Sequence, residues 1–346
     1  MSRIQIKQKL GRSSLLFGIL ALVALAVLII LPLIPSLFSV TTMTMVSRIM
    51  IFSVYAMAYD ILRGYTGFIH LGFALTMGSG AYFVGILFVR VANTLPMLLL
   101  AIVGSVVFST FWSLLIGRIA ASGGSVLATA MITMAFGEIM RNTMERWRSV
   151  TNGADGLNYK NPPPFDNRTF IYYLSLAFLL VMGYVLYRFI KSPTGRVIQG
   201  IRENEQRAIF LGYNTNRART IALLVAGIAA SLAGVLFGLL NRFVNTDLFG
   251  MQTTYNAMLY SLIGGTGTLV GAVVGSTVVI VFQNILLNLR NVSPIFERWL
   301  LFFGALYIVV IMYMPQGIVG FYTTWRNKRL HKQLAAELAQ EKQEAH

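Results

Sequence analysis

The chain has 346 residues, of which 56% are hydrophobic and 12% are charged, and its formal net charge is +16. Soluble domains carry about 25% charged residues, so the composition excludes a soluble globular protein and predicts an integral membrane protein. The chain contains no cysteine, which excludes disulfides, thiolate metal sites and cysteine nucleophiles.

The N-terminal segment is basic and leads into an apolar run from Leu15 to Leu31. That run is longer than the roughly 7–15 residues of a signal-peptide core, so we expect it to remain as the first membrane helix. Residues 1–14 would then form a cytoplasmic N-terminus, because basic residues beside membrane helices favour the cytoplasmic side.

Further apolar runs follow along the chain, each near the length of about 20 residues that crosses a bilayer. Together they predict an all-α integral membrane protein with about ten transmembrane helices, near 15–35, 40–62, 68–91, 95–117, 124–141, 170–190, 219–241, 252–265, 269–289 and 298–315. The transmembrane domain would cover 15–322, ahead of a basic C-terminal tail at 323–346.

Basic residues concentrate at the N-terminus, in the segment 191–219 and in the C-terminal tail, all beside apolar runs. This placement is typical of positive-inside topology and not of a nucleic-acid footprint. All three regions are therefore predicted to be cytoplasmic, including both termini, and the segment 142–169 becomes an external loop. Arg141, Arg146 and Arg148 run against this trend.

Two glycine turns share the pattern G-x-T-G, one from Gly64 to Gly67 and one from Gly264 to Gly267. Small residues follow each turn, which suggests an internal repeat of parallel sense. Two interpretations stay open. The glycines either let helices pack closely or mark broken helices along a substrate pathway, whose candidate residues would be Gly67, Gly72, Gly264, Gly267 and Gly271.

Residues for catalysis are scarce. The histidines are His70, His331 and His346, from which no metal cluster or catalytic triad can be assembled. The sequence also lacks the phosphate loop G-x-x-x-x-G-K-[ST], so ATP hydrolysis of that type would need a separate subunit. We therefore expect no enzyme, no catalytic residue and no metal site in this chain.

Three ionisable residues fall within or beside apolar runs, where charge is costly and often functional. Asp60 lies near Arg63 and could simply pair with it at an interface. His70 is either a packing residue or a pathway residue. Glu138 is a pathway candidate too, unless it only forms an ion pair with Arg141.

The external loop contains T-N-G-A-D-G-L at 151–157. Its glycines are typical of a turn that holds Asp155 in place. Asp155 either shapes the mouth that receives a ligand or caps the local turn.

The segment 191–219 combines helically spaced apolar residues with charged ones, and Pro193 marks its start. It predicts a cytoplasmic amphipathic helix or helix pair. Such a helix could lie in lipid headgroups, but the acidic Glu203 and Glu205 favour docking in a protein groove.

A resemblance becomes specific at S-P-T-G-R-V-I-Q-G-I-R-E-N-E-Q-R-A-I-F-L-G, from Ser192 to Gly212. This run resembles the signature of LivM-type permeases of branched-chain amino acid ABC transporters. Similar motifs follow the family order at 151–157, at 263–275 (I-G-G-T-G-T-L-V-G-A-V-V-G) and at 314–320 (M-P-Q-G-I-V-G). The chain departs from the family pattern at His70, where serine is common, at Asn152, where glycine is usual, and at Ala272, where proline is usual.

The resemblance implies a permease subunit in a bacterial inner membrane. Its partners would be the lipid bilayer, a second LivH-like permease, two cytoplasmic ABC ATPases and a periplasmic binding protein. ATP and magnesium would bind to the ATPases, and no cofactor would bind to this chain. The coupling helix would use Gly195, Arg196, Ile201, Arg202, Glu203, Asn204, Glu205, Arg207 and Gly212.

The implied substrate is a branched-chain or related amino acid. Import of urea, short amides or organic acids is the alternative within the same frame. An ion-coupled secondary transporter or a channel is the alternative from another class, but buried carboxylates for coupling and filter-like repeats are scarce in the sequence.

Overall fold

The computed structural model describes residues 23, 26–33, 39–121, 126–289, 299–314, 316–322 and 324. They belong to two compact units, 1–43 with 321–346, and 44–320. In the first unit, a short 3₁₀ turn spans Leu31–Leu33. Most of the predicted first helix at 15–35 and of the tail at 323–346 lies outside the described residues.

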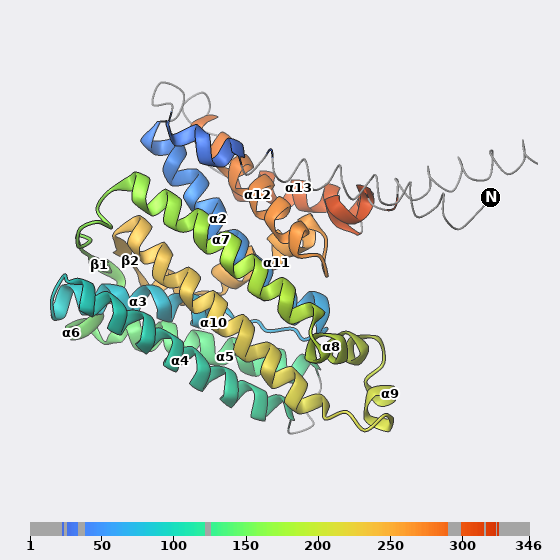
Figure 1. Cartoon of the computed structure of the whole chain (residues 1–346). Coiled ribbons are helices and arrows are strands. Elements are labelled where there is room, and N and C mark those ends of the chain that lie inside the picture. The colour runs from blue at the N-terminus through green and yellow to red at the C-terminus, as the bar shows by residue number, and fades with distance from the viewer. Residues whose placement is uncertain are drawn as a thin grey trace, which may run out of the picture. The chain divides into compact units, whose positions relative to one another are not determined.

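Every predicted range from 40–62 onward contains a helix (Figure 1). The long helices are α2 (Val40–Asp60), α3 (Ala74–Arg90), α4 (Leu95–Ala121), α5 (Val126–Arg146), α7 (Arg168–Lys191), α10 (Thr215–Asn241), α11 (Met251–Gly264), α12 (Leu269–Leu289) and α13 (Trp299–Tyr313). The shorter helices are α6 (Arg148–Thr151), α8 (Pro193–Glu203) and α9 (Glu205–Phe210).

Five stretches of the described chain are long and apolar enough to cross a membrane: Val40–Tyr65, Leu95–Ala120, Arg168–Lys191, Thr215–Asn241 and Leu269–Leu289. The protein is therefore an α-helical membrane protein, and about ten crossings stay a prediction. With 14 residues, α11 reaches only about 21 Å, short of the hydrocarbon core of about 30 Å. It ends at the second glycine turn, which leads into α12.

Helix α10 is central to the second unit, where it packs against α3, α4, α7 and α8. Its seam with α3 depends on glycine at both faces. A Cβ atom on Gly80 would lie 2.0 Å from the Ser231 carbonyl oxygen, and one on Gly234 would lie 2.0 Å from the Met77 carbonyl oxygen. The two backbones meet closely because no side chain separates them.

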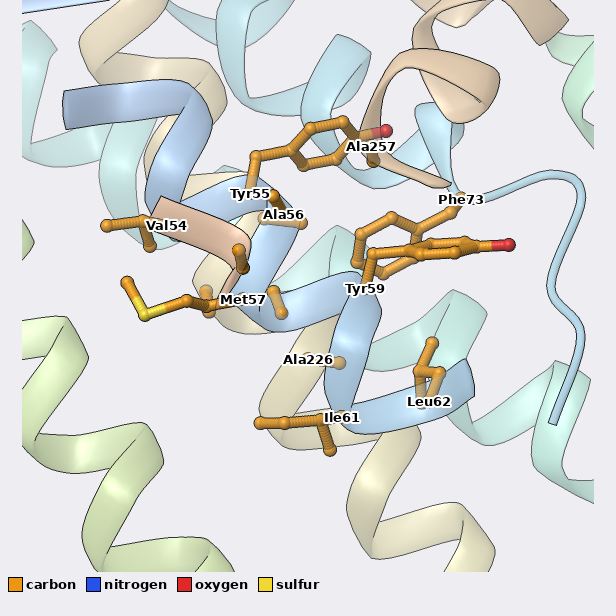
Figure 2. Close-up of a cluster of buried hydrophobic side chains, with 14 of the residues drawn as sticks. Val54, Tyr55, Ala56, Met57, Tyr59, Ile61, Leu62, Phe73, Ala226 and Ala257 are labelled. Carbon is orange, nitrogen blue, oxygen red and sulfur yellow. The ribbon is translucent and has the colours of Figure 1, made fainter. Parts of the chain in front are cut away.

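The core contains an aromatic group on α2 and on the segment before α3. Figure 2 shows Tyr55, Tyr59 and Phe73 together, with Ala226 of α10 and Ala257 of α11 nearby. The rings of Tyr55 and Phe73 stack with their centroids 5.2 Å apart. The Tyr59 ring meets the Phe73 ring edge-on, with a centroid distance of 5.5 Å. These contacts place α2 in the interior of the second unit.

Burial separates the inner helices from the outer ones. Of the most apolar 18 residues in Val40–Tyr65, 78% are buried, and the corresponding share in Thr215–Asn241 is 72%. In α4 and in α7, only 28% of the corresponding 18 residues are buried. Their exposed side chains are apolar, for example Val107 and Phe111 on α4 and Val181 on α7, as expected for surfaces that face lipid or another membrane subunit.

The predicted external loop joins the end of α10 through two short strands. β1 (Leu157–Asn158) pairs antiparallel with β2 (Phe243–Val244), with Leu157 opposite Val244. Arg242 forms an ion pair with Asp166 at 2.9 Å, and Arg168 donates a hydrogen bond of 2.7 Å to the Leu240 carbonyl oxygen. The loop is therefore anchored on the C-terminal end of α10.

Candidate functional site

The amphipathic segment forms a helix pair rather than one long helix. Ser192 caps α8 by accepting a hydrogen bond of 3.1 Å from the Gly195 amide, directly before Pro193. Asn204 ends α8 and caps α9, since its side chain accepts from the Arg207 amide at 2.9 Å. Both residues are good N-caps, and proline suits the first helical position.

One side of this pair is buried and the other is exposed. Gly195, Ile198 and Ile201 are buried, and a Cβ on Gly195 would lie 2.3 Å from the Ile190 carbonyl oxygen, so α8 lies very close to the end of α7. Figure 1 shows α8 and α9 near the beginning of α10. Gly212, with φ of +84°, lies with Leu211 in the turn that follows α9.

A groove of about 730 Å³ lies between α8 and α9. Its walls combine apolar and charged side chains of both signs. They comprise Pro193, Arg196, Val197, Gly200, Glu203, Asn204, Arg207, Ala208, Leu211 and Tyr213. Phe210 and Leu211 at the end of α9 are 87% and 69% exposed. A surface of this kind can bind an amphipathic element of another protein.

The two glutamates that the sequence analysis treats alike differ in the structure. Glu205 accepts two hydrogen bonds from Arg219 of α10, at 2.6 and 2.7 Å. Such a bidentate pair is strongly oriented, so Glu205 ties α9 to α10. Glu203 is exposed and lines the groove, where its carboxylate can contact a partner.

Arg202, at the end of α8, reaches the first glycine turn. Its guanidinium donates a hydrogen bond to the Gly64 carbonyl oxygen. A Cβ on Gly67 would lie 3.4 Å from the Arg202 side chain. Gly64 belongs to a π-helical turn at Ile61–Tyr65 that directly follows α2, and such turns occur frequently at functional sites.

Asp60 connects the first glycine turn to the second one. It is fully buried, and its carboxylate accepts hydrogen bonds from the Ser261 hydroxyl at 2.6 Å and from the Gly267 amide at 3.0 and 3.1 Å. The interpretation in which Asp60 only pairs with Arg63 at an interface is therefore wrong. Arg63 is one of two arginines, with Arg202, that act on the carboxylate electrostatically.

The glycines proposed for a pathway fall into two groups. A Cβ on Gly72 would lie 1.8 Å from the Thr133 carbonyl oxygen, and one on Gly264 would lie 1.7 Å from that of Gly271. These contacts favour the packing interpretation there. Gly67 and Gly267 instead have φ values of +72° and +78°, which their turns require. Whether any of the five glycines lines a pathway stays a prediction.

The other pathway candidates lie on separate elements. His70 is 2% exposed, its ring contacts Phe68 and Phe73, and its Nδ1 atom has no hydrogen-bond partner among the described residues. Glu138 forms an ion pair of 3.1 Å with Arg141 on the same helix. A role for either residue in transport stays a prediction.

Asp155 is exposed in a turn that other residues hold. Arg90 of α3 donates a hydrogen bond of 2.9 Å to the Asn152 side-chain oxygen and one of 3.2 Å to the Val150 carbonyl oxygen. Asn152 has a φ of 58°, a conformation that asparagine adopts more readily than most residues. This explains why asparagine can replace the usual glycine there.

Ala272, the other departure near a glycine turn, donates its amide to the Thr268 carbonyl oxygen at 3.2 Å. Proline could not make this bond. Sequence reasoning missed the contacts of Asp60 and Arg202 between the turns. Its one relevant signal was the matching G-x-T-G pattern, because hydrogen bonds between residues 201 and 207 positions apart leave no local trace.

Residues 41–311 match the family model described as the permease component of branched-chain amino acid transport systems. The chain belongs to this family. The match includes the α8–α9 pair and both glycine turns, and it confirms the family resemblance; the motif at 314–320 lies beyond the matched residues. The relatives are transport permease subunits, not enzymes.

Individual relatives are distant. The chain is 22% identical over 310 residues to the high-affinity branched-chain amino acid permease LivM of Escherichia coli, covering 78% of this chain and 68% of the relative. It is 29% identical over 145 residues to LivH of Salmonella typhimurium, covering 42% and 44%. It is also 33% identical over 127 residues to the autoinducer 2 import permease LsrC of Photorhabdus laumondii, covering 35% and 37%. No solved structure gives a significant match.

Proposed function

We propose that this chain is a membrane-spanning subunit of an ATP-driven importer that passes branched-chain or related amino acids across a bacterial inner membrane. The observation that carries the proposal is the family match over residues 41–311. The five apolar stretches long enough to cross a bilayer support the membrane location. Substrate would reach the chain from a periplasmic binding protein.

The chain would act beside a second, LivH-like permease and two cytoplasmic ATPases that bind ATP and magnesium. Relatives named LivM and LivH both align with this sequence, which supports pairing of two similar permeases. Basic residues near both termini and in 191–219 favour a cytoplasmic position for all three regions.

The groove between α8 and α9 would receive an element of an ATPase subunit. Its lining combines the charged Arg196, Glu203 and Arg207 with the apolar Val197 and Ala208. The caps and the Glu205–Arg219 pair hold the two helices rigidly. A rigid surface helix can transmit a movement of its partner to the membrane helices.

The decisive experiment is uptake by the complete complex in proteoliposomes, with the binding protein outside and ATP inside. Leucine, isoleucine and valine are compared with urea, a short amide, an organic acid and autoinducer 2. We expect ATP-dependent uptake of the aliphatic amino acids. ATP-dependent uptake of one of the other compounds instead would replace the proposed substrate class. Uptake driven by an ion gradient without ATP would overturn the proposed function.

Charge reversal at the two glutamates tests the groove. Glu203→Lys should lower ligand-stimulated ATPase activity without changing the melting temperature, since Glu203 is exposed. Glu205→Lys should also lower the melting temperature, because lysine would face Arg219. Gln206→Lys, at an exposed position outside the groove lining, is the control. If Glu203→Lys behaves like this control, the groove does not dock the ATPase at this residue.

A further inference from the structure

The two glycine turns touch each other directly. A Cβ atom on Gly64 would lie 2.5 Å from the Gly267 amide nitrogen and 2.2 Å from the Asp60 carboxylate. No larger residue fits at Gly64 without moving one of these groups. Each turn sits between two helices, the first between α2 and α3 and the second between α11 and α12.

Asp60 is the polar centre of this contact. Its carboxylate bonds to Ser261 of α11 and to the Gly267 amide of the second turn, while its own backbone leads into the first turn. Arg202 and Arg63 are close enough to act electrostatically on it. The buried charge therefore has both hydrogen-bond donors and nearby positive charge, which a stable buried carboxylate needs.

Arg202 joins α8 to the same place. It bonds to the Gly64 carbonyl oxygen, and its guanidinium would lie 3.2 Å from a Cβ on Gly267. Contacts thus continue from the Arg202 side chain through the Gly64 backbone to the Asp60 carboxylate, and from there to the Gly267 amide and the Ser261 hydroxyl. Hydrogen bonds that are buried at their centre favour one arrangement of the elements that they join.

We propose that Asp60 is a positioning residue that joins α8 to both glycine turns, so that α8 and the two turns move as one body. A movement of α8 would then reach the end of α11 and the beginning of α12 directly. The inference rests on the proposed function in one respect, namely that an ATPase subunit is what moves α8. The inference also identifies the membrane helices to which α8 would pass its movement, α11 and α12, and the sequence motif of α8 does not identify them.

The structural link can be tested without ATPase subunits, in the full chain in lipid nanodiscs. The sequence has no cysteine, so Gly200→Cys and Val270→Cys allow two spin labels. Gly200 on α8 has no atom within 4 Å of an added Cβ, and Val270 at the start of α12 is 61% exposed. Pulsed electron paramagnetic resonance then measures the distribution of distances between the two spin labels.

We expect one narrow distribution in the labelled parent and a distribution at least twice as broad after Asp60→Ala. Ser53→Ala is the matched control, because Ser53 forms a buried hydrogen bond of 2.7 Å to Ser276 between α2 and α12. This control should keep the narrow distribution. An equally narrow distribution in the Asp60→Ala chain would overturn the proposal.

Asp60→Asn tests the consequence for transport in the complete complex. Asparagine has the same size, and its side-chain oxygen can still accept hydrogen bonds from both Ser261 and Gly267, but it removes the charge. We expect about a 2- to 30-fold loss of ligand-stimulated ATPase activity and uptake, with basal ATPase activity retained and a melting temperature no lower than that of Ser53→Ala. An equal loss of uptake in Ser53→Ala would reduce Asp60 to a structural role.

The two failures remain distinguishable. If the unmutated complex does not couple ATP hydrolysis to uptake, the proposed function fails. The label distances would still decide whether Asp60 joins α8 to the turns.

Discussion

The seam between α3 and α10 and the pair of glycine turns both depend on close approach of two backbones, but they are held in different ways. At the seam, Gly80 and Gly234 lie directly against carbonyl oxygens of the opposite helix. At the turns, a buried carboxylate bonds the two segments and an arginine from a surface helix reaches in. Glycine in the seam serves packing, whereas Gly64 in the first turn makes room for a polar link.

The largest effect is expected at the seam. Gly80→Ala and Gly234→Ala each place a methyl group 2.0 Å from a backbone oxygen, and overpacking costs typically about 1–3 kcal/mol, occasionally more. We expect little folded protein, measured as monodisperse yield and melting temperature in detergent. Gly200→Ala, where no atom lies within 4 Å, is the control and should fold normally. Normal yield of both seam variants would show that the helices can separate.

The next effect is expected at the turns. Gly67→Ala and Gly267→Ala introduce a side chain at positive φ, which costs about 1–2 kcal/mol. We expect a modest fall in melting temperature and a larger fall in uptake, because these turns contact Arg202. Gly72→Ala and Gly271→Ala serve as packing comparisons. If uptake falls strictly in step with melting temperature at all four sites, the turns have no role beyond packing.

A smaller effect is expected at Glu138, whose partner is on the same helix. The Glu138–Arg141 pair has side chains that are each 34% exposed, and such pairs contribute about 0.2–1 kcal/mol. Glu138→Gln should barely change the melting temperature, in contrast to the buried Asp60→Ala. Uptake at the level of the unmutated complex would exclude Glu138 from the pathway.

The smallest effect on stability is expected at Asp155. Its turn is held by Arg90 and Asn152, so Asp155→Ala should leave the melting temperature unchanged. Arg90→Ala, which removes those bonds, should lower it and is the positive control. We expect uptake at low binding-protein concentration to fall if Asp155 helps to receive the ligand. Loss of thermal stability alone would instead assign Asp155 to the local turn.

Several elements could be predicted because their causes are local. Apolar runs of span length predict the helices, and Pro193 marks the start of α8, which the structure confirms. A helix pair is only one of two predicted alternatives, since a single long helix satisfies the same apolar spacing. The cap that Asn204 provides to α9 decided it.

The sequence by itself therefore determined the membrane class, the family and the amphipathic segment between α7 and α10, because composition, periodicity and motifs depend on neighbouring residues. Only the tertiary structure decided which glutamate faces the groove and what holds Asp60. Those contacts join residues 14, 138 and about 200 positions apart. A side chain's partner across such a separation is set by how the helices pack, and neither periodicity nor spacing records it.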